Sequence, residues 1–422
     1  MTAPIPHSPV VIVGGGQAGL SVSHHLTQRG IDHRVFEKHT AAHTWATQRW
    51  DTFCLVTPNW QCDLPGHPYD GPDPDGFMKK DEIVAYLQAF VAKVKPPIRE
   101  GVAVTRVARR DDGLFAVQTS DGDYTADEIV VAAGGYHTPI IPRMAERLPG
   151  TITQIHSNQY RNPAQLPDGA VLVVGSGQSG AQIAEDLHLA GRQVHLAVGD
   201  APRCARFYRG RDVVTWLADM GYYDMTVENH PLRDGVRDNT NHYVTGRDGG
   251  RDIDLRRFAT EGMQLYGVLE DYADGAFRFR DNLKRSLDQA DRTYNSINAA
   301  IDTHIAKAGI AAPAQAPYAP VWEPGAPVTA LPLEGSGITS ILWCIGFTPD
   351  FRWLDASVFN GAGHPKHRRG VTAEAGISFI GLPWLNTWGS GRFGAVGRDA
   401  EYLAQVIAAR LGTGDAAMRV AV

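Results

Sequence analysis

Two glycine-rich turns have the residue types and spacing that bind the pyrophosphate of a dinucleotide. The turn GGGQAG at 14–19 follows the apolar run 10–13, and GSGQSG at 175–180 follows the apolar run 171–174. In this pattern the first glycine makes a tight turn, the second lets the backbone approach the phosphates, and the third lets the helix pack on the strand. One copy is weak evidence, but two copies in register, 161 residues apart, predict two dinucleotide sites.

The following helix presents free N–H groups and a positive dipole end to the phosphates at each site. We therefore expect cofactor contacts from Gly14, Gly16, Gln17, Ala18 and Gly19 in the first turn and from Gly175, Gly177, Gln178, Ser179 and Gly180 in the second.

The two copies differ at the end of the next strand. Glu37 ends that strand in the first copy, where a carboxylate binds a ribose diol, whereas Val198 holds the equivalent position in the second. The second site thus lacks an acid there that would repel a 2′-phosphate, and four arginines follow within 203–211. Arg203 is the predicted phosphate clamp, which favours NADPH at this site. The alternative is that Asp200 contacts a ribose hydroxyl at this site, as is expected of Glu37 in the first copy.

The elements around these turns predict an α/β fold with two Rossmann-like dinucleotide-binding domains of the three-layer ββα type. A helix at 81–94, three strands between 102 and 128 and a buried strand at 129–133 suit an FAD-binding variant. Apolar spacings of 3 and 4 predict a long helix over 283–305. The predicted order is an FAD domain (1–165), an inserted NADPH domain (166–330) and a return to the FAD domain (331–422).

Composition narrows the function further. The chain of 422 residues has a formal charge of −6, which argues against nucleic-acid binding, and no apolar run long enough to span a membrane. Four cysteines without a C-x-x-C pair argue for a reducing, cytoplasmic location and against a disulfide reductase. No metal-ligand spacing is present, so no metal site is predicted.

The chain resembles the class B flavin-dependent monooxygenases, which include flavin-containing and plant-type indole-pyruvate monooxygenases. The resemblance rests on both glycine turns, Glu37, the WATQRW segment at 45–50, and His156 with Tyr160. The family signature F-x-G-x-x-x-H-x-x-x-(F/Y/W) matches only in its second half, because Gly150 stands six residues before His156 instead of four. TPNWQCDLPG and WGSGRF resemble a bacterial subgroup often encoded beside nitrilase-type genes.

This resemblance implies FAD and NADPH as cofactors, and a C4a-(hydro)peroxyflavin that oxygenates a small nitrogen or sulfur nucleophile or a carbonyl. The implied partners are O2 and a small-molecule substrate, with a homodimer as a candidate assembly. Two residues are the implied catalytic candidates, Asn59 as a hydrogen-bond donor near flavin C4a and Arg392. Further implied cofactor contacts are Lys38, Trp45, Arg49, Val104, Ala133, Gly134 and Gly381.

Two alternatives share every cofactor motif. One is an NADPH oxidase or reductase that passes electrons from FAD to O2 or to a protein partner, and the other is a flavin-containing sensor without turnover. The polar segment 203–280 is open to two interpretations, a flap over the nicotinamide site or a solvated excursion.

Overall fold

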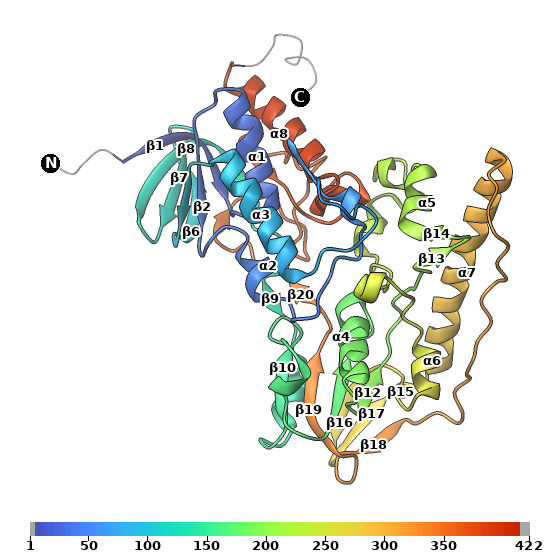
Figure 1. Ribbon diagram of the computed structural model, residues 1–422. Coiled ribbons are helices and arrows are strands. Elements are labelled where there is room, and N and C mark those ends of the chain that lie inside the picture. Colours follow the sequence, from blue (N-terminus) through green and yellow to red (C-terminus); the bar gives the residue numbers. More distant parts are fainter. Residues whose placement is uncertain (1–4, 414–422) are drawn as a thin grey trace.

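The structure is a computed structural model that describes residues 5–413, and it consists of two lobes (Figure 1). The first lobe is built on a sheet with strand order β21-β6-β7-β8-β1-β2-β5, with β22 paired to β8. Its strands are β1 (His7–Val13), β2 (His33–Glu37), β5 (Ile98–Glu100), β6 (Val104–Arg109), β7 (Phe115–Thr119), β8 (Gly122–Val131), β21 (Leu354–Asp355) and β22 (Ile377–Phe379). Strand β1 lies inside this sheet, between β8 and β2 and parallel to both.

Alternation along β1 distributes its side chains between two apolar clusters. Val10 and Ile12 pack against α1 (Gln17–Gln28), α3 (Lys80–Val94) and α8 (Val396–Arg410). Val11 and Val13 face a second cluster, formed with the β7 and β8 strands and the segment 351–358. Because both faces are covered, β1 is a continuous apolar run, as expected of a buried parallel strand.

The second lobe has an all-parallel sheet of order β10-β19-β11-β12-β15. Its strands are β10 (Thr153–His156), β11 (Ala170–Val174), β12 (Val194–Ala197), β15 (Gln264–Tyr266) and β19 (Ile338–Trp343). One apolar cluster joins it to α4 (Gln178–Leu189), α6 (Leu255–Thr260) and the start of α7 (Leu283–Ala308). A second cluster joins it to the antiparallel strands β16 (Leu269–Ala273), β17 (Ala276–Phe279) and β18 (Ala330–Pro332). The predicted class, α/β with two Rossmann-like units, is confirmed.

The lobe boundaries differ from the predicted ones at 165 and 330. Strand β10 precedes residue 165 and β19 follows residue 330, yet both belong to the second sheet. Two antiparallel segments, β9 (Thr138–Pro139) and β20 (Phe347–Thr348), carry the chain between the lobes. Strands 153–156 and 338–343 could join either sheet by their own composition, so only their partners decide the lobe to which they belong.

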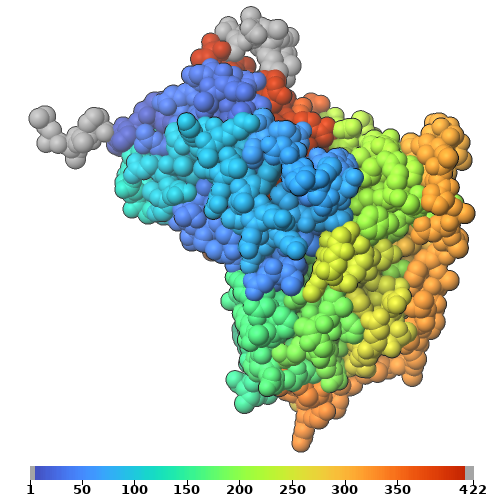
Figure 2. All heavy atoms as spheres, viewed as in Figure 1, coloured from blue at the N-terminus to red at the C-terminus, as the bar shows by residue number. Residues whose placement is uncertain are grey.

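The remaining segments run over the surface and between the lobes. The long excursion after β2 holds α2 (His43–Thr47), a 3-10 turn at Asn59–Gln61, β3 (Asp63–Leu64) and β4 (His67–Pro68). The segment 203–254 holds β13 (Phe207–Tyr208), β14 (Arg211–Asp212), α5 (Val213–Asp219) and three 3-10 turns. In Figure 2 the blue excursion meets the yellow-green segment near residue 245 where the lobes join. None of the helices within 5–413 has the length and apolar character needed to cross a membrane.

Candidate functional site

The first glycine turn is closed on its protein side and open on the other. Gly14 has φ +114°, and a Cβ there would lie 2.5 Å from the Ala132 carbonyl oxygen. A Cβ on Gly19 would lie 2.0 Å from the Gly14 carbonyl oxygen, whereas one on Gly16 would meet no protein atom within 4 Å. No side chain caps the first turn of α1, which begins at Gln17. Space and free N–H groups therefore coincide where a pyrophosphate would bind.

Glu37 orders the edge of this first site. Its Oε2 accepts a hydrogen bond from the Gly15 backbone N (2.8 Å), and its Oε1 accepts one from the His39 backbone N (2.9 Å). The Val102 backbone N donates to the Glu37 carbonyl (2.9 Å), so the chain just before β6 forms part of the same edge. The predicted contact Val104 lies two residues further on, where it pairs with Thr119 in the β-meander. Lys38 is exposed beside Glu37.

Three segments distant in sequence meet at the mouth of the first turn. The Gln17 side chain donates to the Gly391 carbonyl (3.3 Å) and accepts from Trp45 Nε1 (3.1 Å). The Trp45 ring lies 5.2 Å from that of Phe393. Gly381, with φ +79°, packs so closely that a Cβ there would lie 2.7 Å from Cβ of Ala18. The excursion after β2 and the lead-in to α8 are thus both held against the start of α1.

Ala133 and Gly134 follow β8, the strand beside β1 in the sheet. Gly134 has φ +76°, and a Cβ on it would meet no protein atom within 4 Å. These residues therefore lie at the carboxyl end of the central strands, where ligands bind in open α/β sheets.

The second turn repeats the first in detail. Gly175 has φ +100°, and a Cβ there would lie 2.7 Å from the Cys344 carbonyl oxygen. A Cβ on Gly180 would lie 1.9 Å from the Gly175 carbonyl oxygen. A Cβ on Gly177 would have a single neighbour within 4 Å, Cγ2 of Thr240 at 3.8 Å, and Ser179 is not fully buried. The second cradle is therefore also closed on its protein side and open toward a ligand.

The segment 240–247 covers the second cradle. Gln178 Nε2 and Gln182 Nε2 both donate to the Val244 carbonyl (2.8 Å each). Thr226 forms an isolated β-bridge with Thr387, in the lead-in to α8. The part of the polar segment between 222 and 247 thus packs against the second cradle and against the first lobe. This placement agrees with a cover near the site and not with a solvated excursion.

The arginines that follow β12 are engaged within the protein, which corrects one prediction. Arg203 is buried, forms ion pairs with Asp254 (3.4 Å) and Asp291 (3.0 Å), and lies over the Tyr318 ring (4.0 Å). The three other arginines of this run are paired with aspartates as well. Arg203 as a clamp for a nucleotide phosphate does not fit this placement, since burial of its charge already depends on two carboxylates. The sequence shows the cations but not their partners beside α6 and on α7.

Asp200 and Arg285 form the exposed charged pair at the edge of the second cradle. Gly199, the residue before Asp200, donates its backbone N–H to Ser176 Oγ within the glycine turn (3.0 Å). Asp200 accepts from Ser286 Oγ (2.6 Å) and pairs with Arg285 at 3.3 Å. A carboxylate and a guanidinium therefore both lie near the position of an adenosine ribose. Arg285 has no signal in the local motif, because α7 brings it there from a distant part of the chain.

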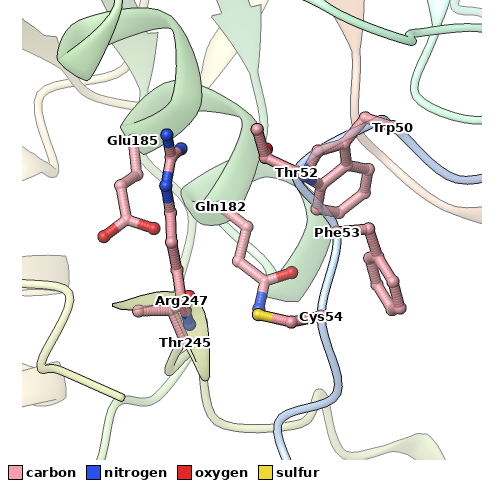
Figure 3. Close-up of a pocket in the computed structure, with 8 residues that line it drawn as sticks. All are labelled: Trp50, Thr52, Phe53, Cys54, Gln182, Glu185, Thr245 and Arg247. Carbon is pink, nitrogen blue, oxygen red and sulfur yellow. Dashed lines mark hydrogen bonds between the residues drawn. The ribbon is translucent and has the colours of Figure 1, made fainter. Parts of the chain in front are cut away.

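A small recess lies where the lobes touch, between the 50–54 segment, α4 and the 245–247 turn (Figure 3). Beside it, the buried Asp186 accepts hydrogen bonds from Thr52 Oγ1 (2.7 Å), Tyr160 Oη (2.6 Å) and Arg247 Nη1 (2.7 Å). The neighbouring Glu185 is also buried and accepts from Arg251 (2.9 Å); burial raises the pKa of this carboxyl. Every one of these polar groups has a protein partner, so the cluster joins the lobes and offers little to a ligand.

Asn59 is a second correction. Its Nδ2 donates to the Asp73 carbonyl (2.9 Å), and its Oδ1 accepts from the Met78 backbone N (2.7 Å). The side chain is 4% exposed. Both ends of the amide hold the loop 73–78, so the prediction of a donor near flavin C4a does not fit. The Pro-Asn-Trp turn alone could not distinguish these roles.

The four thiols provide no redox pair. Cys54, Cys62, Cys204 and Cys344 are all unpaired. Burial raises the pKa of Cys54 to about 11 and that of each of the other three to about 12. Thiols with these values stay protonated near neutral pH and are poor nucleophiles. Within residues 5–413, no three His, Cys, Asp or Glu side chains gather as a metal site.

Arg49 and Arg392 each lie against a tryptophan, Trp45 in the excursion after β2 and Trp388 in the lead-in to α8. The Arg49 guanidinium lies 5.0 Å from the Trp45 ring centroid, and its Nη1 donates to the Gln48 carbonyl (2.9 Å). The Arg392 guanidinium stacks 3.6 Å from the Trp388 ring, and its Nη2 donates to Asn241 Oδ1 (2.8 Å). Burial lowers the pKa of both arginines.

Comparison with known proteins places the chain in a family. A family described as pyridine nucleotide-disulphide oxidoreductases matches residues 11–218, which include both glycine turns. A CzcO-like oxidoreductase of Geobacillus kaustophilus is 30% identical over 399 residues, covering 93% of this chain and 96% of the relative. The chain belongs to the CzcO-like oxidoreductases, within the class B flavin monooxygenase-like family. It is therefore an oxidoreductase.

Two further likenesses agree with this membership. A probable indole-3-pyruvate monooxygenase of Arabidopsis thaliana, YUCCA4, is 31% identical over 193 residues, which is 44% of this chain and 46% of that protein. A solved flavin-containing monooxygenase of Stenotrophomonas maltophilia shares the fold, with a TM-score of 0.66 at 18% identity, covering 96% of this chain and all of the other. At the level of the family, FAD and a pyridine nucleotide are confirmed as the cofactors.

Proposed function

We propose that this CzcO-like chain is an FAD-dependent monooxygenase that takes reducing equivalents from NADPH. Its substrate is a small nitrogen or sulfur nucleophile or a carbonyl compound. The observation that carries the proposal is the pair of open glycine cradles in a chain whose four thiols are unpaired and have raised pKa values. Because the chain has no thiol pair of its own that could accept electrons from a bound flavin, molecular oxygen is the favoured acceptor.

The residues of the first lobe fit FAD. The open space beside Gly16 and the free N–H groups of α1 suit its pyrophosphate, and Glu37 suits its ribose. Bound FAD supplies hydride acceptance and oxygen activation, and the protein supplies orientation and electrostatics. Trp45 and Gln17 position the lead-in to α8 beside the ring site. The 240–247 cover keeps water from the junction when the second cradle is filled.

Arg285, and not Arg203, is the residue that would bind the 2′-phosphate of NADPH as the electron donor. Arg285 is exposed and lies on the first turn of α7, where it can reach a 2′-phosphate. The carboxylate of Asp200 repels a 2′-phosphate and favours a ribose with a free 2′-hydroxyl. The balance of these two groups sets the preference between NADPH and NADH.

Substrate-dependent coupling tests the proposal. Purified holoprotein is screened against amines, sulfides and ketones while NADPH consumption and hydrogen peroxide release are both measured, with 18O2 as the oxidant. A monooxygenase incorporates 18O into product and releases less peroxide per NADPH when its substrate is present. One peroxide per NADPH with every compound would instead support an NADPH oxidase, and electron transfer without peroxide would support a reductase with a protein partner.

A further inference from the structure

Arg49 and Arg392 differ from the fully buried arginines of the chain. Arg203, Arg206 and Arg256 each form at least one ion pair with an aspartate. Neither Arg49 nor Arg392 has a carboxylate within 4.0 Å anywhere in residues 5–413, although both are half-buried. A guanidinium removed from water without a counter-charge is costly, so such a group favours an anion.

Several segments converge on these two cations. Tyr136, on the first crossing between the lobes, lies within electrostatic range of both guanidinium groups. Tyr222 and Tyr223 lie within the same range of Arg392, and the Tyr223 ring lies 4.7 Å from that of Trp388. The cations thus lie at the junction of the lobes, among aromatic rings.

The free donors of the two side chains suit a carboxylate. Arg392 uses its two terminal nitrogens for Trp388 and Asn241, which leaves Nε and the outer N–H bonds available, and Arg49 uses only Nη1. A guanidinium binds a carboxylate through two parallel hydrogen bonds, and stacking on Trp388 fixes the plane of the Arg392 fork.

We infer that Arg392, assisted by Arg49, binds the carboxylate of the substrate, so that the substrate of this enzyme is a small organic acid with an apolar body. This inference rests on the proposed function and narrows its substrate class. The competing anion is the reduced flavin, which the experiment below distinguishes from the substrate. The substrate is favoured because the Arg392 guanidinium is held by Asn241, in the 240–247 cover, and stacks on Trp388, whose ring contacts Tyr223 of the 222–247 segment.

Binding of benzoate and benzamide to oxidised holoprotein tests the inference without turnover. These probes have the same shape and differ in charge, and binding is followed by perturbation of the flavin absorbance. Benzoate is expected to bind at least about tenfold more tightly than benzamide, as for a charge-assisted hydrogen-bonded pair. R392Q abolishes this preference, R392K retains part of it, and R49Q lowers it less.

The matched control is R368Q. Arg368 is exposed and pairs with Glu228, across the same contact between the 222–247 segment and the first lobe. This variant is expected to bind benzoate as the wild type does. FAD content and thermal unfolding of each variant exclude loss of folding as the cause.

Two results would overturn the inference. One is equal affinity for the acid and the amide in the wild type, repeated with phenylacetate and phenylacetamide. The other is unchanged benzoate affinity in R392Q with a lower flavin midpoint potential, which would assign the arginine to the reduced flavin. The binding experiment needs no oxygen. If the monooxygenase proposal fails, which would be seen as one peroxide released per NADPH, the comparison of benzoate with benzamide still tests the role of Arg392.

Discussion

The two glycine cradles have the same backbone and different surroundings. Helices α1 and α4 each begin at the glutamine of the motif and span 12 residues. A Cβ on the third glycine would meet the carbonyl of the first at 2.0 Å in one cradle and at 1.9 Å in the other. This agreement over a shift of 161 residues shows that the turn geometry follows from local sequence.

The differences lie at the strand edge and in the cover. Glu37 accepts one hydrogen bond from Gly15 of the first turn and one from His39, whereas at the second turn Ser176 Oγ accepts from Gly199 and Asp200 lies outside the turn. The outer side of α1 carries His24 and His25 where α4 carries the buried pair Glu185 and Asp186. The shared turn is the proposed pyrophosphate site in each lobe, and we expect these surroundings to decide which nucleotide binds there.

The largest expected effect comes from the third glycine of each cradle. G19A is expected to lose FAD almost completely, and G180A to retain FAD but to resist reduction by NADPH, because each added Cβ displaces the turn carbonyl at a cost of ~3 kcal/mol. Measurements are flavin content and anaerobic bleaching. G150A, at an exposed turn with free space around it, is the control. Loss of FAD from G180A would show that the cradles do not act independently.

The second-largest effect is expected from Glu37, at the strand edge of the first cradle. E37A removes the acceptor for two backbone N–H groups and the ribose contact, so FAD affinity is expected to fall by about 2 kcal/mol, or roughly thirtyfold. Reconstitution of apoprotein with FAD measures this change. S176A, which removes the acceptor for the Gly199 backbone N–H at the edge of the second cradle, should weaken nucleotide binding about fivefold and leave FAD affinity unchanged. The reverse pattern would contradict the assignment of the cradles.

A smaller effect is expected from the charges outside the second turn. D200N removes repulsion of a 2′-phosphate and R285Q removes attraction, so the ratio of NADP+ to NAD+ affinity should rise in the first variant and fall in the second. Both side chains are more than 60% exposed, so each change is only about threefold. Titration of holoprotein with each nucleotide gives the ratio. R292Q, at an exposed position two turns further along the same helix, should leave the ratio unchanged. An equal response of both nucleotides to D200N or R285Q would refute the prediction.

Substitution of the cysteines should change NADPH oxidation least of all. Because burial raises their pKa values to about 11 or 12, all four are protonated at about pH 8, and alkylation by iodoacetamide should be slow until the pH approaches those values. C54A and C62A should oxidise NADPH at the wild-type rate. Rapid alkylation near that mildly alkaline pH, or disulfide reduction that C54A abolishes, would reinstate a disulfide reductase.

Elements with strong periodicity were predictable within a few residues. The helix expected over 283–305 is α7, Leu283–Ala308, and that expected over 81–94 is α3, Lys80–Val94. Membership of the strands 153–156 and 338–343 in the second sheet was not predictable, because a buried parallel strand has the same composition in either lobe. The same holds for Arg203, whose aspartate partners are distant in sequence.

The sequence by itself determined the two cradles, the α/β class and the lack of a C-x-x-C pair, because turn geometry and apolar periodicity depend on neighbouring residues. Only the tertiary structure decided which of the charges within residues 5–413 are neutralised and which are left without a partner. Arg203 was expected to bind a phosphate and is held by Asp254 and Asp291, whereas Arg49 and Arg392 have no acid beside them in that part of the chain. Pairing of charges depends on segments brought together by folding, which spacing along the chain does not encode.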